Sequence, residues 1–438
     1  MKIARAEPPF LFFIAGEPSG DRLGAMLICA LRRRLGGDVR VAGVGGEEMA
    51  RAGLKSLVPL SDLAVMGLAE VLPRAPLLLR RVKEVTAAIL ESRPDGVVTI
   101  DSSGFCWRVA AALRRRGLKI PLIHYVAPMV WAWRPGRARR IARLYDHLIT
   151  LLPFEPPFFE KEGLSCSYFG HPVTESGADR GDGARFRARH GLGAEESVIA
   201  VLPGSRSLEV GRLLPIFGAA LARLTPLLGG FRVVVPTVAT VAERVQSGIS
   251  RWPGRPILVS ETGAKYDAFA ASRAALAASG SVALELAMAR VPMVVAYRLN
   301  PLTDAFLRRL VRVREVNLVN LILGRRLVGE YLGGECTPER LAAALREILL
   351  DEEVRARHRA GYDEAIAPLK AGDGSPCLKA AEEILEIVAA HSRSRASSVW
   401  AEPPSHLSRP GLTRPPTPLK PPPNVDVDAR NRSGHDGQ

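Results

Sequence analysis

One short segment in the second half of the chain combines residues that could bind an anionic ligand. Residues 278–285 read Ala-Ser-Gly-Ser-Val-Ala-Leu-Glu, and they follow an apolar run over 274–278. This pattern predicts a strand that passes through small residues into a helix ending near Ala289. Gly280 would let the backbone approach a ligand closely, and the unpaired N–H groups and dipole of the helix start would attract an anion.

Three side chains of this segment extend the hypothesis. Glu285 lies about one helical turn into the predicted helix, where its carboxylate could accept hydrogen bonds from sugar hydroxyls. Ser279 and Ser281 flank the glycine and would lie beside the same ligand. The alternative is that the serines only cap a helix and that Glu285 is solvated.

A second candidate contact for an anion follows another predicted strand. Residues 203–206 (Pro-Gly-Ser-Arg) come directly after the apolar run 198–202, and Ser205 and Arg206 are their polar members. The guanidinium of Arg206 has the fork geometry that can bind a diphosphate. Asn320 stands inside an apolar run further along, so its amide must bind either something specific or a structural partner.

Polar side chains also follow two predicted strands in the first half. The apolar run 10–15 precedes Glu17 and Ser19, and the run 96–100 precedes Asp101. Open parallel sheets place their ligand contacts at the carboxyl ends of the strands. We therefore expect these three side chains at such an edge.

The elements that must position these residues alternate between strands and helices, which predicts a doubly wound α/β architecture. In the first half, strands are predicted over 10–15, 39–44, 96–100, 121–125, 147–152 and 165–169. A Gly-, Asp- and Arg-rich stretch over 174–195 predicts a linker, after which the pattern restarts. The later strands are predicted over 198–202, 231–235, 257–260, 274–278 and 293–297.

We predict two Rossmann-like domains, over residues 1–176 and 177–365, which face a cleft suited to a two-part substrate. A terminal helical segment follows over 366–391, with its last helix over 375–390. From 392 to 438 the composition changes to Pro, Ser and Arg. Such a tail cannot bury enough apolar surface to become ordered.

The charge balance favours an anionic partner. Lys and Arg number 60 against 45 Asp and Glu, a formal net charge of +15, which would attract nucleic acid, anionic lipid or a phosphorylated substrate. Solvated, arginine-rich faces would produce the same excess. Aromatic residues make up only 6% and are not interleaved with the basic runs, as stacking on single-stranded nucleic acid requires. We therefore expect no nucleic-acid partner.

Cysteine usage and hydropathy favour the cytoplasm. The five cysteines are far apart and form no C-x-x-C pair, which indicates free thiols and no structural zinc. No run reaches the roughly 20 apolar residues of a membrane-spanning helix. The N-terminus superficially suggests a signal peptide, but residues 10–15 pass directly into Glu17 and Asp21 and indicate a first strand. No metal or cofactor is expected.

Residues 61–85 join apolar side chains to a basic cluster. Met66 and its apolar neighbours are followed by Arg80 and Arg81. This pattern suits a surface that meets acyl chains and phosphate head groups. It equally suits a buried helix with a charged edge.

Taken together, the motifs resemble those of the lipid-A-disaccharide synthase family. They occur in the family's order over roughly residues 10–390, and the ordered set is far more specific than any single motif. The segments that carry the resemblance are 15–21 (AGEPSGD), 100–101 (ID), 124–126 (HYV), 130–134 (VWAWR), 152–155 (LPFE), 170–171 (GH), 202–206 (LPGSR), 278–285 (ASGSVALE), 292–295 (PMVV), 317–320 (NLVN) and 324–325 (GR).

The resemblance implies an inverting glycosyltransferase of the GT-B fold, with the nucleotide held by the C-terminal domain and the lipid acceptor by the N-terminal one. It implies that UDP-2,3-diacylglucosamine and 2,3-diacylglucosamine 1-phosphate are joined by a β-1,6 linkage with release of UDP. It also suggests a homodimer. With the apolar and basic segment, it places the enzyme peripherally on the cytoplasmic face of the inner membrane.

The candidate residues fit this chemistry on their own terms, and the resemblance adds that Glu285 and Asn320 would hold the nucleotide. Asp101 is the favoured base for the acceptor hydroxyl, and Glu17 and Ser19 would orient the acceptor or substitute as base. Arg206 and the helix start at Gly280 would stabilise the leaving UDP without a metal. The remaining assignments are Ser205, Ser279, Ser281, Glu285 and Asn320 to the UDP-sugar, and Met66, Arg80, Arg81 and Trp133 to the lipid acceptor.

Departures from the family pattern leave rival interpretations open. Pro18 stands where a small residue is common, Met129 replaces a customary serine, and Ser102 and Ser103 follow Asp101 where a proline and a second aspartate are usual. One rival is a catalytically silent protein that binds nucleotide-sugar or membrane. Another is a transferase of the same fold that uses UDP-N-acetylglucosamine with a different acceptor.

Overall fold

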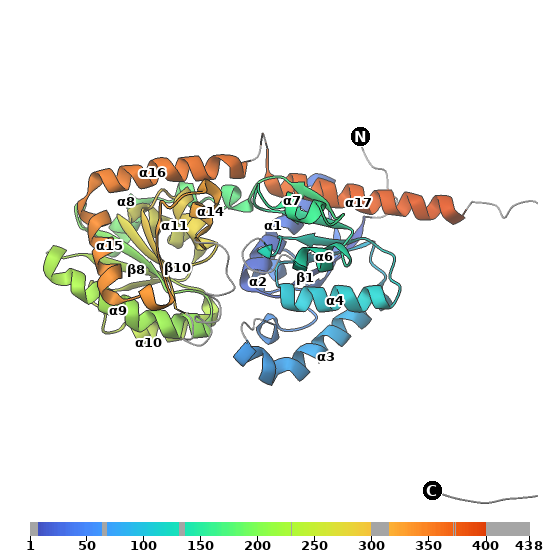
Figure 1. Ribbon diagram of the computed structural model, residues 1–438, viewed down its shortest axis with the longest axis horizontal. Coiled ribbons are helices and arrows are strands. Elements are labelled where there is room, and N and C mark those ends of the chain that lie inside the picture. Colours follow the sequence, from blue (N-terminus) through green and yellow to red (C-terminus); the bar gives the residue numbers. More distant parts are fainter. Residues whose placement is uncertain are drawn as a thin grey trace, which may run out of the picture. The chain divides into compact units, whose positions relative to one another are not determined.

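Two parallel β-sheets with helices on both faces organise the chain in this computed structural model (Figure 1). The structure describes residues 8–63, 68–130, 136–228, 230–298, 315–370, 372 and 374–399, and within these each sheet has six strands. The predicted doubly wound α/β class with two Rossmann-like sheets is therefore confirmed.

The first sheet has the strand order β2-β1-β3-β4-β5-β6, with every adjacent pair parallel. Its strands are β1 (Phe10–Ala15), β2 (Arg40–Val44), β3 (Gly96–Ile100), β4 (Leu122–Tyr125), β5 (His147–Thr150) and β6 (Ser165–Tyr168). The helices of this half are α1 (Pro18–Leu35), α2 (Glu47–Arg51), α3 (Leu68–Ser92), α4 (Ser103–Arg115), α6 (Gly136–Ala142) and α7 (Pro156–Glu160). The strand order reverses between β1 and β3, which is where such sheets bind ligands.

The second sheet has the order β12-β11-β10-β7-β8-β9 and is also parallel. Its strands are β7 (Val198–Leu202), β8 (Arg232–Pro236), β9 (Ile257–Val259), β10 (Ala274–Ala278), β11 (Met293–Tyr297) and β12 (Gly329–Leu332). The helices that follow or flank them are α8 (Gly183–His190), α9 (Ser207–Leu228), α10 (Ala242–Ile249), α11 (Thr262–Ala271), α12 (Val282–Met288), α14 (Leu318–Leu323), α15 (Pro338–Leu350) and α16 (Glu352–Ile366). Here the order reverses between β7 and β10.

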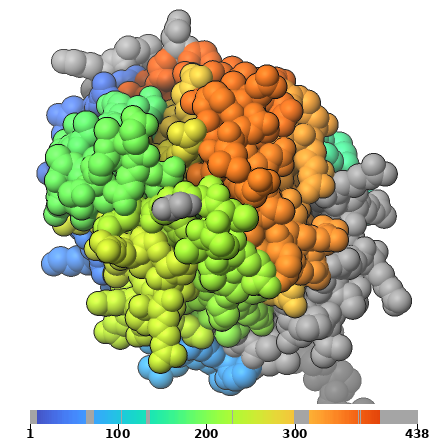
Figure 2. Space-filling view, turned by 90° about the vertical axis from the view of Figure 1, so that its left-hand side faces the viewer, coloured from blue at the N-terminus to red at the C-terminus, as the bar shows by residue number. Residues whose placement is uncertain are grey.

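Alternation along each strand divides the apolar side chains between two faces. In β7, Ile199 and Val201 belong to the core beneath α9, α10 and α15, whereas Val198 and Ala200 belong to the core beneath α8, α11 and α12. Figure 2 shows the outer side of this half, where α9 and α10 (light to yellow-green) and α15 (orange) belong to the first of these layers. Because both faces are covered, the strands are almost wholly apolar.

One helix in the described residues, α9, has the length and apolar composition of a membrane span. Its apolar face, including Leu213, Phe217 and Leu221, is fully buried against strands of the second sheet. It shares one core with residues of β7, β8 and β10. A core helix of an α/β layer passes the same test of length and composition as a membrane span.

The last described helix, α17 (Pro376–Val399), returns to the first sheet. Ala381 and Ile384 are buried in the same core as Leu11 and Phe13 of β1. A Cβ on Gly96, at the start of β3, would lie 2.8 Å from Cγ2 of Val388, so close packing of α17 requires a glycine there. One face of the first sheet is therefore covered partly by α17, which follows the second sheet in the sequence.

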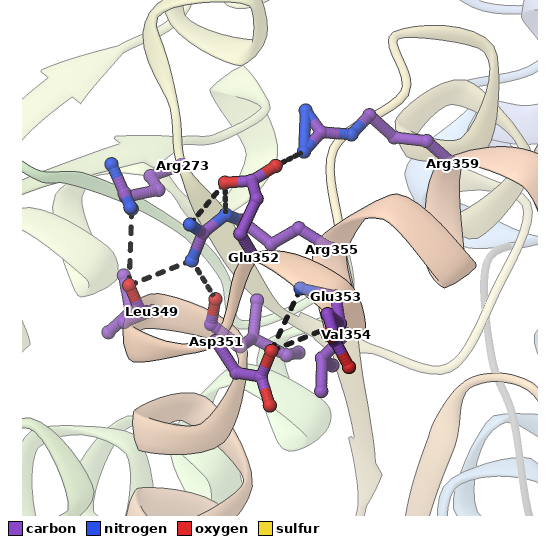
Figure 3. A network of polar contacts seen from close by, with 9 residues as sticks. Arg273, Leu349, Asp351, Glu352, Glu353, Val354, Arg355 and Arg359 are labelled. Atoms are coloured by element: carbon purple, nitrogen blue, oxygen red, sulfur yellow. Dashed lines mark hydrogen bonds and ion pairs between the residues drawn. The ribbon is translucent and has the colours of Figure 1, made fainter.

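A buried arginine joins α15 to α16 (Figure 3). Arg355, which is 4% exposed, donates hydrogen bonds to the carbonyls of Ile348 and Leu349 at 2.6 and 2.8 Å. Arg273, just before β10, donates to the same Leu349 carbonyl at 3.1 Å. These bonds satisfy carbonyls at the end of α15 that have no partner within the helix.

The predicted strands are all present, with bounds that agree to within about two residues. The sequence did not predict β12, and its pattern placed the end of the last helix at Ala390, whereas α17 continues to Val399. The predicted linker over 174–195 contains the helix α8, whose Phe186 is buried in the core. Most of the predicted tail, from residue 400, lies outside the described residues. The domain boundaries at 176 and 365 stay a prediction.

Candidate active site at the ends of four strands

The carboxyl ends of β1 and β3 bring together three predicted residues. Glu17 and Ser19 follow β1, Asp101 follows β3, and the Ser19 hydroxyl donates a hydrogen bond to Oδ2 of Asp101 at 3.2 Å. Glu17 is the residue before α1, but its carboxylate does not cap that helix. It is therefore available for a contact with the second half of the chain.

The backbone around Asp101 is held in an unusual conformation. Asp101 and Ser102 have φ angles of +50° and +42°, a region that non-glycine residues rarely adopt. The N–H of Asp101 donates to the carbonyl of Tyr125 at 3.0 Å, which fixes the turn against β4. A Cβ on Gly16 would lie 2.2 Å from Oγ of Ser102, so only glycine allows the two loops to approach. Strained residues of this kind gather at functional sites.

The surroundings of Asp101 make its carboxyl a weaker acid than usual. Burial, and next the negative charge of Glu17, raise the pKa of Asp101 to about 6. Hydrogen bonds from the Ser102 N–H and the Ser19 hydroxyl, and the charge of Arg206, act in the opposite direction. A carboxylate with a pKa near neutrality is suited to accept a proton from a hydroxyl group.

Arg206 follows β7 and contacts Glu17 across the two halves of the chain. Gly204 adopts a φ of +115°, and the N–H of Ser205 donates to Oε2 of Glu209 at 3.1 Å. Nη2 of Arg206 donates a hydrogen bond to the Glu17 carboxylate. Burial alone would lower the pKa of Arg206, but the charges of Glu17 and Glu209 raise it. The guanidinium is therefore a permanent positive charge beside the Asp101 loop.

The small-residue segment after β10 has the predicted form. The N–H of Ser279 donates to the carbonyl of Ala296 at 3.2 Å, Gly280 and Ser281 are exposed, and α12 begins at Val282. The Ser281 side chain caps no N–H group of α12, so the capping alternative is wrong for that residue. The space beside Gly280 is open, as a turn that admits a ligand requires.

Glu285 is buried rather than solvated, with 7% of its surface exposed. Lys265 donates to Oε2 at 2.8 Å, Tyr266 donates to Oε1 at 3.2 Å, and Arg22 of α1 also donates to Oε1. Burial would raise the pKa of Glu285, but the positive charges of Lys265 and Arg22 lower it below its usual value. The carboxylate is therefore ionised and enclosed by donors.

Sequence comparison identifies the family. A family model described as lipid-A-disaccharide synthetase matches residues 11–376. The chain belongs to this family. It is 55% identical over 382 residues to the lipid-A-disaccharide synthase of Rhodospirillum centenum, covering 87% of this chain and 95% of the relative. It is 49% identical over 380 residues to that of Paramagnetospirillum magneticum, covering 86% and 97%.

Among solved structures, the fold is similar to UDP-GlcNAc 2-epimerase from Neisseria meningitidis bound to UDP-GlcNAc. The TM-score is 0.58 at 13% identity, with 87% of this chain and 99% of that chain covered. At this identity the similarity concerns the fold, and it agrees with the GT-B architecture expected of the lipid-A-disaccharide synthetase family.

Asn320, which the family resemblance assigned to the nucleotide, is used within the protein. Its amide nitrogen donates to the Val328 carbonyl at 2.9 Å and to Oε1 of Glu330 at 2.7 Å, and its oxygen accepts from the N–H groups of Leu327 and Val328. These bonds use the two donors and two acceptor sites of the amide. This arrangement agrees with the structural alternative, because the amide fixes the start of β12, and the assignment of Asn320 to the UDP-sugar stays a prediction.

Asp21 of the 15–21 motif also has a structural role. Its carboxylate accepts hydrogen bonds from the N–H groups of Gly46, Glu48 and Met49 at 2.7, 3.0 and 3.0 Å. These groups lie at the start of α2, where N–H groups lack helical partners. Asp21 thereby fixes α1 to the loop after β2.

The predicted lipid contacts are only partly described. Met66 and Trp133 lie outside the described residues. Arg80 and Arg81 lie on α3, and each forms an ion pair with Glu84, at 2.9 and 2.6 Å. Arg81 also contacts Asp62 at 2.7 Å. Neither arginine contacts the Asp101 site.

Arg22, Lys265 and Tyr266, which surround Glu285, were not predicted from the sequence. Arg22 could have been considered as a candidate site residue, because it directly follows the 15–21 motif that contains Glu17 and Ser19. Lys265 and Tyr266 gave no such signal, since they lie on a helix without a recognisable motif. Among the described residues, no group of three or more His, Cys, Asp or Glu side chains could hold a metal ion.

Proposed function

We propose that the chain joins UDP-2,3-diacylglucosamine to the 6-hydroxyl of 2,3-diacylglucosamine 1-phosphate and releases UDP. Membership of the lipid-A-disaccharide synthetase family supports this function, because the match spans nearly the whole length of relatives that carry the synthase name. The observation that carries the assignment of roles is the contact of Asp101 with Ser19 beside the Glu17–Arg206 pair.

In the proposed reaction, the acceptor hydroxyl oxygen attacks the anomeric carbon of the donor from the side opposite UDP. The bond from that carbon to the UDP oxygen breaks, its electron pair leaves with UDP, and the configuration inverts. Asp101 accepts the hydroxyl proton, which its raised pKa of about 6 allows near neutral pH. Ser19 orients the Asp101 carboxylate, and Glu17 holds Arg206 in place.

The donor occupies the ends of β7 and β10 in this proposal. Arg206 and Ser205 contact the diphosphate, and the N–H groups of the turn around Gly280 add positive potential for the departing UDP. Ser279 and Ser281 border the same turn, and Glu285 accepts hydrogen bonds from the ribose. The amide of Asn320 supports the neighbouring strand β12.

A mass-spectrometric assay with both diacyl substrates tests this function. The parent protein should form the tetraacyl disaccharide phosphate, and Asp101→Asn should slow its formation by about 10²–10⁴-fold. Arg223→Gln is a matched surface control, because Arg223 pairs with Glu339 on the outer helices. Product from Asp101→Asn at the parental rate would exclude Asp101 as the base. UDP binding without any product would favour the silent binding protein, and turnover of UDP-N-acetylglucosamine would favour the rival transferase.

We further propose that α3 contacts the cytoplasmic face of the inner membrane. Leu79 is 54% exposed, and the neighbouring Arg80 side chain is 72% exposed. An exposed apolar side chain beside a cation suits an anionic lipid surface. Arg80→Glu should weaken co-sedimentation with phosphatidylglycerol vesicles more than Arg223→Glu does. Equal binding by the two variants would exclude this surface.

The homodimer suggested by the family resemblance also remains a proposal. Light scattering of the purified protein would decide it, because a monomer at assay concentration would exclude a dimer as the active form.

A further inference from the structure

The first turns of α1 contact two of the side chains that the proposed function assigns to the UDP-sugar. Glu17 accepts a hydrogen bond from Arg206 after β7, and Arg22 donates one to Glu285 after β10. In each pair, the side chain at the start of α1 offers the same kind of hydrogen-bonding group, acceptor or donor, as the ligand group that is expected there. The Glu17 carboxylate corresponds to a phosphate oxygen, and the Arg22 guanidinium corresponds to the donating hydroxyls of a ribose.

The donors around Glu285 leave little room for a ligand hydroxyl. Lys265 contacts one carboxylate oxygen, and Arg22 and Tyr266 contact the other. Arg22 also donates to the hydroxyl oxygen of Tyr266, which ties these donors together. Oε1 already accepts two hydrogen bonds and Glu285 is only 7% exposed, so we expect a ribose hydroxyl to bind Oε1 only after one of its two donors moves away.

Arg22 is the donor best placed to leave. Lys265 and Tyr266 lie on α11, which belongs to the same half as Glu285, whereas Arg22 lies on α1 of the other half. The Arg22 side chain is 34% exposed, compared with 19% for Lys265. If the Arg22 side chain swings away, Lys265 still balances the charge of Glu285. The carboxylate then stays ionised and can accept hydrogen bonds from hydroxyls.

We propose that Arg22 competes with the ribose of the nucleotide for Glu285, so that binding of the donor sugar or of UDP exchanges the Arg22 contact for hydroxyl contacts. The inference rests on the proposed function, which places the nucleotide at Glu285. Arg22 acts in this proposal as a competing side chain rather than a catalytic one. While Arg22 occupies Glu285, the carboxylate cannot bind the ribose. The apparent affinity for UDP is therefore the intrinsic affinity multiplied by the fraction of molecules in which Glu285 is free of Arg22.

Calorimetric titration with UDP tests the competition. Arg22→Met should bind UDP more tightly than the parent, on the order of tenfold, because a charge-assisted contact no longer has to break. Arg22→Gln should shift the affinity in the same direction, which guards against a packing effect of one variant. Arg51→Met is the matched control and should bind like the parent. Arg51 lines the same surface pocket as Arg22 but pairs with Glu48 on its own helix.

A Glu285→Gln variant distinguishes the competition by Arg22 from the placement of the nucleotide at Glu285. If Glu285→Gln weakens UDP binding but both Arg22 variants bind like the parent or more weakly, the competition is overturned and the nucleotide site stands. If Glu285→Gln binds UDP like the parent, the nucleotide does not use Glu285 and the inference fails. The proposed transfer reaction is judged separately, by product formation in the Asp101 assay. With the competition in place, the KM for the donor should also fall in both Arg22 variants.

Discussion

At the scale of the residue, the chemistry depends on how one carboxyl group is held. Asp101 has a φ of +50° and accepts a hydrogen bond from Ser19. The loop backbone and this hydrogen bond therefore fix the position of its carboxyl group. Glu17 supplies a nearby negative charge, and burial removes much of the water. Both effects favour the neutral acid, which is the form that results when the carboxylate takes a proton.

The raised pKa predicts how activity depends on pH. Asp101 must be ionised to accept a proton, so kcat/KM should fall about tenfold per pH unit below its pKa of about 6. The measurement is a pH–rate profile at saturating acceptor, with Ser19→Ala as a second protein. Removing the Ser19 hydroxyl should move the acidic limb to higher pH, because its hydrogen bond favours the ionised carboxylate. An acidic limb that stays at the same pH in both proteins would contradict the role of Ser19.

The same pKa has a consequence for stability. Since folding raises the pKa of Asp101 from 3.8 to about 6, ionisation opposes folding at pH 8 and has no effect well below pH 3.8. Asp101→Asn should therefore be more stable than the parent by about 1–3 kcal/mol at pH 8. The advantage should shrink as the pH falls from about 6 to about 4. Urea unfolding of both proteins at pH 8 and pH 4.5 measures this difference in the free energy of unfolding. If the difference were the same at the two pH values, ionisation of Asp101 would not be its cause.

The position of the site could be predicted from the sequence, but its pairings could not. Asp101 follows a strand of the first sheet, whereas Arg206 and the segment that leads to Glu285 follow strands of the second. The carboxyl ends of parallel strands meet at one edge of each sheet. The pairs Glu17–Arg206 and Arg22–Glu285 join residues 189 and 263 positions apart, and their contact depends on the packing of the two halves. Asn320 shows a second limit of the sequence. An asparagine inside an apolar run gives the same pattern whether its amide binds a ligand or the backbone.

At the scale of the element, helix ends need partners for their unpaired groups. Arg355 supplies donors to the last turn of α15 from within α16 (Figure 3). Most strands were predictable because both of their faces are covered and their residues are apolar, as in β1, β3 and β7. The exception is β12, whose four residues include Gly329 and Glu330 and carry no such pattern.

Replacement of Arg355 should destabilise the protein. Arg355→Met leaves the Ile348 and Leu349 carbonyls without this donor in a buried place, at a cost of about 2–3 kcal/mol. Arg359→Met is the matched control, because Arg359 contacts the same Glu352 from a more exposed position and should change stability little. Equilibrium unfolding in urea compares them. Equal midpoints for the two variants would show that the carbonyl contacts contribute nothing.

At the scale of the whole molecule, the last described helix packs on the first sheet. After the second sheet is complete, α17 returns to β1 and β3 and buries Ala381 and Ile384 against Leu11 and Phe13. His147 of β5 adds a polar contact, with Nε2 lying 3.4 Å from Oε1 of Glu383. The loops that carry Glu17 and Asp101 leave the same strands, so the geometry of the proposed active site depends on the last helix as well as on the first sheet.

Shortening the chain at two points tests this dependence. Removal of residues 400–438 should leave the thermal midpoint and the transfer rate unchanged, because the described packing of the first sheet uses α17 only up to Val388. Removal of 376–438 exposes the apolar face beneath α17 and should abolish cooperative unfolding.

Ile384→Ala, which removes part of one buried side chain, should lower the stability by about 2–4 kcal/mol. If Ile384→Ala unfolded at the parental urea concentration, α17 would not be part of the first core in solution. The partly buried Ile387 offers the matched alanine control, for which a smaller loss is expected because it lies at the margin of the same core.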